Sequence, residues 1–170
     1  MKQLSERLNR LSPSATLAMS QKSNELKAQG VDVINMSVGE PDFNTPEHIK
    51  EAAKQAIDDN FSRYSPVPGY PALRNAIVAK LKNENGLNYT PAQISCANGA
   101  KQSVCNTIMV LVNEGDEVIV PAPYWVSYPE MVKMADGTPV IISADIDQDF
   151  KITPSQLEAA ITPKTKALIL

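Results

Sequence analysis

Short apolar runs alternate with stretches of helical spacing along the second half of the chain. The runs have the length and composition of buried strands, and the stretches between them repeat apolar residues with the period of a helix. Such alternation predicts an α/β fold with a mostly parallel sheet covered on both faces, although an individual strand can be reversed. The expected strands are residues 94–97, 117–120, 138–143 and 166–170, and the later helices start near Ser127 and Pro154.

The first half of the chain reads as helices joined by loops that contain glycine and proline. Residues 1–30 form an arm and a helix, which Gly30 would end at its C′ position. Thr45-Pro46-Glu47 predicts an N-cap, a proline at the first helical position and an acid in the first turn. Apolar residues at helical spacing predict two helices, at Ile49, Ala52, Ala53, Ala56 and Ile57 and at Leu73, Ile77 and Leu81, the second ended by Asn85-Gly86.

Composition argues against several classes of function. The 170 residues allow one domain with a substantial core, and a net charge of −3 does not suggest a nucleic-acid partner. No apolar run has the length of a membrane span or the form of a signal peptide, so we expect a cytoplasmic protein without a membrane partner. Cys96 and Cys105 lack CxxC spacing, which favours free, packed thiols, and His48, the only histidine, cannot form a histidine-based metal site.

The C-terminal end of the sequence is strand-like. The chain stops inside the apolar run TKALIL, which follows a Thr162-Pro163 turn. An uncovered edge strand invites mispairing, so a complete protein seldom ends on one. We therefore expect the sheet to continue in residues beyond Leu170, with a packed C-terminal edge strand as the alternative.

The candidate chemistry is concentrated in residues 94–128. A strand is followed by the small-residue turn Asn98-Gly99-Ala100-Lys101, where the first N–H groups of a helix, at its positive end, could face an anion. The next strand would end on the same side of the sheet, before a loop that holds Trp125, the only tryptophan. An anion cradle, a cation at Lys101 and a flat aromatic ring together suit a phosphorylated planar cofactor such as pyridoxal phosphate.

Each of these features also has a purely structural explanation. Small-residue turns between strand and helix are common in α/β proteins, and a tryptophan beside two prolines is often half-buried packing. Lys101 has the alternative of a solvated surface charge, and a cation is mildly unfavourable at the positive end of a helix. No single feature decides between the two explanations.

Four segments in register resemble the class I aminotransferases, and within them the bacterial aspartate aminotransferase branch. They are residues 37–43 (SVGEPDF), 64–69 (YSPVPG), 100–102 (AKQ) and 123–129 (PYWVSYP). The resemblance covers essentially the whole chain. It implies fold type I of the pyridoxal-phosphate enzymes, with an N-terminal arm and small-domain segment in residues 1–45 and the first part of a large α/β domain in residues 46–170.

The resemblance also implies contacts with the cofactor. The backbone of Gly99, Ala100 and Lys101 would hold the phosphate of pyridoxal 5′-phosphate, and Trp125 would stack on its ring. Tyr64 would reach across a homodimer to the phosphate in the neighbouring subunit. The Schiff-base lysine, which covalent catalysis requires, lies beyond this chain, so we expect no catalytic residue in it and no activity from the chain alone.

Contacts with the substrate are implied in the same way. Gly39 would offer its N–H to the α-carboxylate beside Trp125, while Thr16 and Lys101 would lie near the far end of the substrate. A cation there favours a second carboxylate, so the resemblance implies transamination between aspartate or glutamate and 2-oxo acids. The alternatives are a related aminotransferase for prephenate, aromatic amino acids or alanine, and a regulator with an aminotransferase-like domain, which would begin with a basic helix-turn-helix region.

Overall fold

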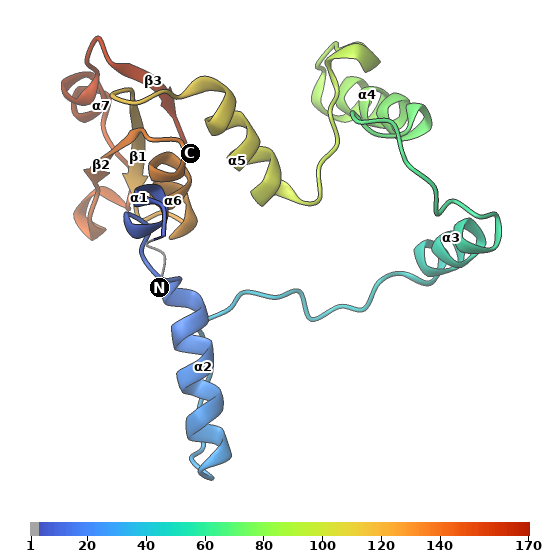
Figure 1. Cartoon of the computed structure of the whole chain (residues 1–170), viewed down its shortest axis with the longest axis horizontal. Coiled ribbons are helices and arrows are strands. Elements are labelled where there is room, and N and C mark those ends of the chain that lie inside the picture. Colours follow the sequence, from blue (N-terminus) through green and yellow to red (C-terminus); the bar gives the residue numbers. More distant parts are fainter. Residues whose placement is uncertain (1–3) are drawn as a thin grey trace. The chain divides into compact units, whose positions relative to one another are not determined.

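A parallel sheet of three strands organises one of the two units of this structure, a computed structural model that describes residues 4–170 (Figure 1). This first unit contains the chain up to Gly39 together with Val104–Leu170, and the second unit is Glu40–Ser103. The sequence analysis predicts a boundary between two domains of the family after residue 45. That boundary is separate from the division into these two units, and it stays a prediction. Among the described residues, no helix is both long enough and apolar enough to cross a membrane.

The sheet has the strand order β2-β1-β3 and all of its pairs are parallel. Parallel neighbours need a crossover, and helices α6 and α7 supply the two crossovers of this sheet. The predicted α/β alternation is therefore confirmed for this part of the chain. The elements are β1 (Glu117–Ala122), α6 (Ser127–Met134), β2 (Thr138–Ser143), α7 (Pro154–Ala160) and β3 (Thr165–Leu168), with a 3-10 turn η2 (Ile146–Gln148) before α7.

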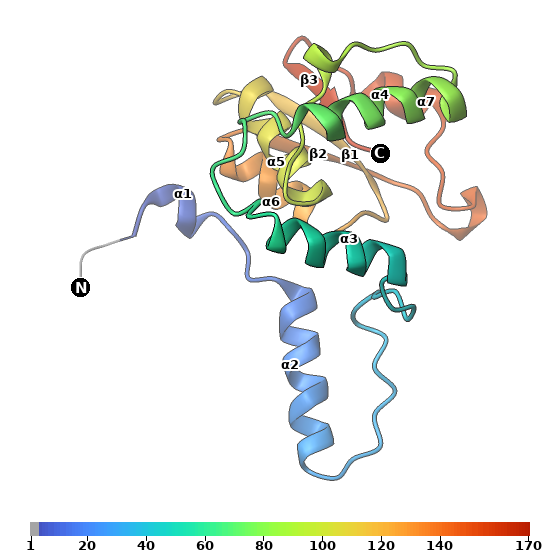
Figure 2. The ribbon, with the colours of Figure 1, turned by 90° about the vertical axis from the view of Figure 1, so that its right-hand side faces the viewer.

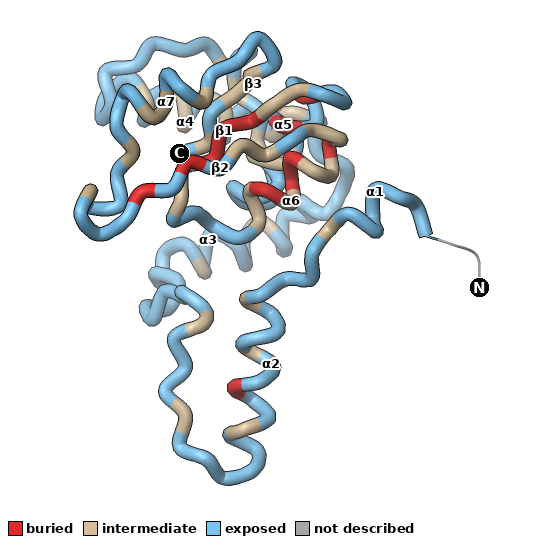
Figure 3. Tube along the Cα trace, turned by 90° about the vertical axis from the view of Figure 1, so that its left-hand side faces the viewer, coloured by how far each residue is buried: buried red, intermediate tan, exposed pale blue. Residues whose placement is uncertain are grey.

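The core of the first unit lies around the central strand β1. Val118, Ile119 and Val120 are no more than 1% exposed, as expected for a strand that is covered on both faces. Ile108 of helix α5 (Ala100–Leu111) and Val132 of α6 pack in the same cluster as Val118 and Val120. Figure 3 shows most of the buried residues on or next to these elements. Burial of each such side chain contributes roughly 1.5–3 kcal/mol.

The N-terminal arm forms two helices, α1 (Glu6–Asn9) and α2 (Ala15–Ala28). The predicted end of α2 is confirmed, because Gly30 lies just beyond it and donates its N–H to the Lys27 carbonyl at 2.9 Å. The next N–H, of Val31, reaches back to the Leu26 carbonyl at 3.1 Å. These two bonds form a Schellman motif, which satisfies carbonyls that the helix leaves without a partner.

The second unit contains α3 (Glu47–Asp58), α4 (Pro71–Asn85), the 3-10 turn η1 (Pro91–Gln93) and the first turn of α5 (Figure 2). Helix α4 begins with its proline and ends at Gly86, as predicted. Its Arg74 guanidinium donates a hydrogen bond to the Pro91 carbonyl, which ties α4 to η1.

Two predictions about secondary structure are wrong. Residues 94–97 are not a strand: Ile94 has extended dihedral angles, but the Cys96 N–H donates to the Pro68 carbonyl in a loop rather than to a neighbouring strand. Helix α3 begins one residue later than expected, since Pro46 is extended and serves as the N-cap. The carbonyl of Pro46 accepts the N–H groups of Ile49 and Lys50, so Thr45 stays outside the helix.

Candidate functional site

A small cradle opens at the start of helix α5. Gly99 has φ +87°, and a Cβ built on it would meet no atom within 4 Å, so the space in front of its backbone is open. The Gln102 side chain folds back over the turn and accepts the Asn98 N–H at 2.6 Å. The Gly99 N–H donates to the Ala97 carbonyl at 2.9 Å, which fixes the turn from the other side.

This cradle has the shape and polarity of an anion site. The first N–H groups of a twelve-residue helix point out of its N-terminus, where the helix dipole is positive. The open space that a side chain would fill at Gly99 lets an anion approach the backbone closely. The predicted phosphate residues Gly99, Ala100 and Lys101 form this turn, and its open backbone fits a phosphate group. Their contact with a phosphate stays a prediction.

Trp125 lies in the loop between β1 and α6, at the carboxyl end of the central strand. Its side chain is 41% exposed, and its ring meets Tyr128 edge to face with centroids 5.6 Å apart. The Tyr128 N–H also donates to the Trp125 carbonyl at 2.9 Å, which holds the loop against α6. A ring that is supported at one side and half exposed can cover a flat ligand.

The other predicted site residues are divided between the two units. Thr16, half-buried in the first turn of α2, and the exposed Gly39 belong to the same unit as Trp125. Tyr64 belongs to the second unit with the cradle, and its side chain is completely exposed, at 106%. Beside the arm lies a pocket of about 350 Å³, lined by Ser12, Pro13, Ser14, Ala15, Tyr124, Val126, Ser127, Pro129, Glu130 and Lys133.

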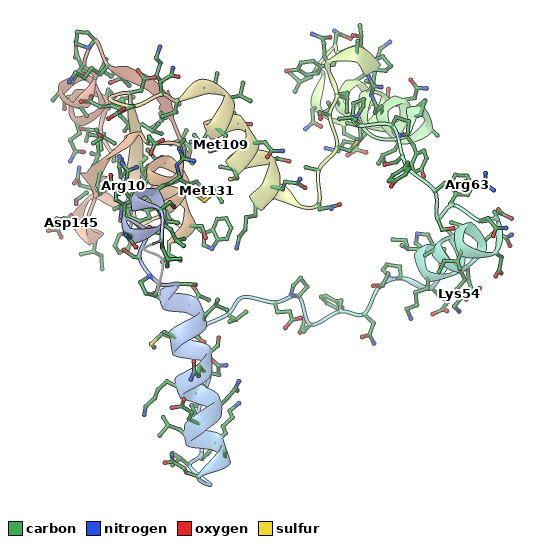
Figure 4. All side chains as sticks on the ribbon, in the orientation of Figure 1. Arg10, Lys54, Arg63, Met109, Met131 and Asp145 are labelled. Atoms are coloured by element: carbon green, nitrogen blue, oxygen red, sulfur yellow. The ribbon has the colours of Figure 1, made fainter. Side chains whose placement is uncertain are left out.

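Two acidic residues of α6 and of its C-terminal end hold the arm, and the sequence analysis did not identify them. Glu130 accepts the Ser12 N–H at 2.8 Å and the Lys133 ammonium at 2.8 Å. Asp136 accepts the Arg7 guanidinium at 2.7 Å and also binds Arg10, which Figure 4 labels. These contacts join residues more than a hundred positions apart, so no local motif indicates them.

The charges of this attachment stabilise one another. The hydrogen bond from Arg7 lowers the pKa of Asp136, an effect that Arg10 reinforces, and the same bond raises the pKa of Arg7. Burial acts to raise the pKa of Glu130, but hydrogen bonds from Lys133 and Ser12 outweigh it and the net pKa is lowered. Both carboxylates are therefore ionised at neutral pH.

Replacement of Asp136 by asparagine should release the start of the arm. Trypsin cleaves after Arg7 and Arg10, whose guanidinium groups are held by Asp136, so cleavage there should become roughly two- to five-fold faster, as for loss of exposed ion pairs. Asp149→Asn, which removes an exposed carboxylate paired only with Lys151 among the described residues, is the control. Equal cleavage rates in the two variants would contradict the role of Asp136.

The pH dependence of this attachment has a defined sign. A carboxylate whose pKa is lowered by folding adds stability above its ordinary pKa and loses it as the pH falls through the lowered value. The ordinary pKa values are 3.8 for Asp136 and 4.5 for Glu130. The protection factors of amides in the arm, which compare their exchange with the intrinsic rate at each pH, should therefore stay constant from neutral pH to about 4.5 and should fall only below it.

The chain was compared with known proteins. Residues 31–170 match the family described as aminotransferase class I and II. The chain is 54% identical over 166 residues to an aspartate/prephenate aminotransferase of Cereibacter sphaeroides and 51% identical over 167 residues to an aspartate aminotransferase of Geobacillus stearothermophilus. Each alignment covers 98% of this chain and 42% of the relative, so the chain spans less than half the length of these relatives.

Solved structures agree with these relatives. An aspartate aminotransferase from Thermus thermophilus with maleate matches with a TM-score of 0.94 and 45% identity, over 100% of this chain and 44% of that one. An aspartate aminotransferase from Rhizobium meliloti matches with a TM-score of 0.93 and 42% identity, over 98% of this chain and 42% of that one. These matches confirm the predicted fold class.

Proposed function

Because this chain belongs to the class I and II aminotransferases, we propose that the full-length protein transfers an amino group between aspartate or glutamate and 2-oxo acids with pyridoxal 5′-phosphate as cofactor. The observation that carries this proposal is the open cradle at Gly99, which fits a phosphate. Similarity to proteins named aspartate aminotransferases supports the choice of substrate.

The residues of this chain would bind and orient the cofactor. The backbone of Gly99, Ala100 and Lys101 would hold its phosphate, and Trp125 would lie against its ring and keep water away. Tyr64 would reach the phosphate in the other subunit of a homodimer, which agrees with its complete exposure here. When bound, pyridoxal phosphate supplies the electron sink that the transfer requires.

The same chain would provide part of the substrate site. Gly39, whose backbone is open to approach, would donate its N–H to the α-carboxylate of the amino acid beside Trp125. Thr16 and Lys101 would lie at the far end, where a cation favours a dicarboxylic substrate. The lysine that binds the cofactor covalently would lie outside residues 1–170, so this region would bind the cofactor without catalysing the reaction alone.

Prephenate is a second candidate substrate. The Cereibacter sphaeroides relative is named an aspartate/prephenate aminotransferase, and this chain is 54% identical to it. Prephenate carries a second carboxylate, so it would meet the same cation as aspartate.

We also propose that the protein acts in the cytoplasm. Residues 1–45 would form the arm and small-domain segment, and residues 46–170 the first part of the large domain.

The experiment that tests this function compares amino donors on the purified full-length protein. With 2-oxoglutarate as acceptor, aspartate should be the preferred donor. The activity towards prephenate, the second candidate substrate, is measured with prephenate as acceptor and glutamate as donor. A protein that binds pyridoxal phosphate but turns over only aromatic amino acids or alanine would contradict the proposed specificity.

The isolated chain of residues 1–170 serves as the control for the covalent step. After incubation with pyridoxal phosphate and borohydride reduction, mass spectrometry should find no stoichiometric adduct on one defined lysine. A single fully modified lysine would place the covalent site inside this region, against the proposal, whereas scattered modification of surface lysines agrees with it.

A further inference from the structure

The loop that carries Tyr64 is tied to the segment that leads into the cradle. The loop closes as a tight turn, in which the Gly69 N–H donates to the Pro66 carbonyl at 2.9 Å. Within the same turn, the Pro68 carbonyl accepts the Cys96 N–H at 3.0 Å. The two segments lie in the same unit, so this contact is part of its internal packing.

Gly69 makes this contact closer than any other residue would allow. A Cβ built on Gly69 would lie 2.8 Å from the Cys96 sulfur and 2.9 Å from the Cys96 Cβ, and the φ of Gly69 is +99°. The backbone of the turn therefore rests directly on the side chain of Cys96. The sulfur could rotate away from an added methyl group, but the Cβ of Cys96 is fixed to its backbone, so a bulkier residue would push the two segments apart.

A short stretch of backbone, constrained by hydrogen bonds, connects Cys96 to the cradle. Gly99 follows three residues later, with its N–H bonded to the Ala97 carbonyl at 2.9 Å. Between them, the Asn98 N–H is held by Gln102 at 2.6 Å, which belongs to the first turn of α5. A displacement of Cys96 would therefore move the backbone that holds the anion.

We propose that the contact between Gly69 and Cys96 sets the spacing of the Tyr64 loop and the Gly99 cradle, which makes Cys96 a positioning residue for the cofactor phosphate. The proposal rests on the proposed function, because both segments matter to the cofactor only in an enzyme that binds pyridoxal phosphate. In the homodimer, the cradle serves its own subunit and Tyr64 the neighbouring one. The contact then links one element of each cofactor site and couples their geometry.

The test uses Gly69→Ala in the full-length protein, with Gly86→Ala as the matched control. Gly86 also has a positive φ, +68°, but a Cβ there would meet nothing within 4 Å. Both variants carry the backbone strain of an alanine in the left-handed region, and only Gly69→Ala pushes against Cys96. The two measurements are amide hydrogen exchange of residues 97–101 in the cofactor-free protein and the dissociation constant of pyridoxal phosphate.

In Gly69→Ala, exchange at residues 97–101 should accelerate several-fold, and cofactor affinity should fall about ten- to a hundred-fold, as for overpacking of a tight contact. In Gly86→Ala, both quantities should stay close to wild type. Cys96→Gly removes the atoms that an added Cβ would meet, so its effect and that of Gly69→Ala should not add in the double variant.

Equal exchange at residues 97–101 in the two alanine variants would overturn the proposal, and so would effects of Gly69→Ala and Cys96→Gly that add fully. If Gly69→Ala does not fold, Cys96→Gly alone tests the proposal. Loss of the contact with Gly69 should accelerate exchange at residues 97–101 and leave exchange in α3 unchanged. A wild-type protein that binds no pyridoxal phosphate would contradict the proposed function, whereas the exchange measurements judge the contact without cofactor.

Discussion

Hybrid dimers of a Tyr64→Phe chain and a Gly99→Asp chain should regain one tight cofactor site per dimer. If Tyr64 acts across the interface, the intact cradle of the first chain meets the intact Tyr64 of the second, which restores one wild-type site. If Tyr64 acts within its own subunit, each site contains one damaged element. Titration of the hybrids with pyridoxal phosphate distinguishes the two arrangements.

The structure supports both halves of this design. The Tyr64 side chain is completely exposed and so is accessible to a second subunit. An aspartate at Gly99 would place a negative charge in the open space of the cradle, opposite the phosphate, in a backbone conformation with φ +87°. Loss of a hydrogen bond to a charged group costs about 1.5–3 kcal/mol, so Tyr64→Phe homodimers should bind cofactor roughly ten- to a hundred-fold more weakly.

Tyr70→Phe is the matched control for the tyrosine. Tyr70 lies in the same loop region, but its ring packs edge to face on Phe61 with centroids 5.8 Å apart, so its replacement should leave cofactor affinity nearly unchanged. Hybrids that bind no better than the Tyr64→Phe homodimer would show that the tyrosine serves its own subunit.

The elements of the parallel sheet were predictable because their signals are local. The run Val118–Val120 is apolar at every position, as a strand covered on both faces must be, and it is the most deeply buried run among residues 4–170. The start of α7 was equally readable, because Pro154 follows Thr153, whose hydroxyl accepts the Gln156 N–H. Each of these signals is contained within a few consecutive residues.

The error at residues 94–97 has a different cause. Extended dihedral angles follow from local sequence, but a strand also needs a neighbour with which its backbone can pair. The Cys96 N–H instead bonds to a loop carbonyl, a partner that no periodicity indicates. The turn that follows was still predicted, since the conformation of Gly99 depends on its lack of a side chain rather than on a distant partner.

Contacts between distant parts of the chain left no signal in the sequence. The attachment of Arg7 and Arg10 to Asp136 joins charges that look like solvated surface residues when each is read alone. The sequence also does not indicate the contact between Gly69 and Cys96, because the turn itself already explains a glycine after a proline. Charge and turn chemistry indicate which groups need a partner, and only the fold determines which partner is near.

Replacement of Lys101 by methionine should lower kcat/KM for aspartate about ten- to a hundred-fold in the full-length enzyme. Lys101 lies in the first turn of α5, where a cation is unfavourable next to the positive end of the helix dipole unless an anion is bound nearby. The backbone of the cradle suits the phosphate, and we propose that the ammonium group meets the second carboxylate of the substrate. A charge-assisted hydrogen bond of this kind contributes about 1.5–3 kcal/mol, and each 1.36 kcal/mol changes the rate constant ten-fold.

The comparison between substrates on one variant decides this prediction. Activity of Lys101→Met towards phenylalanine should change much less than activity towards aspartate, because an apolar side chain does not use the cation. Lys54→Met, which removes an exposed lysine of α3 paired with Glu51, should leave both activities unchanged. An equal loss for aspartate and phenylalanine would mean that Lys101 serves the phosphate rather than the substrate, since damage to cofactor binding lowers every activity alike.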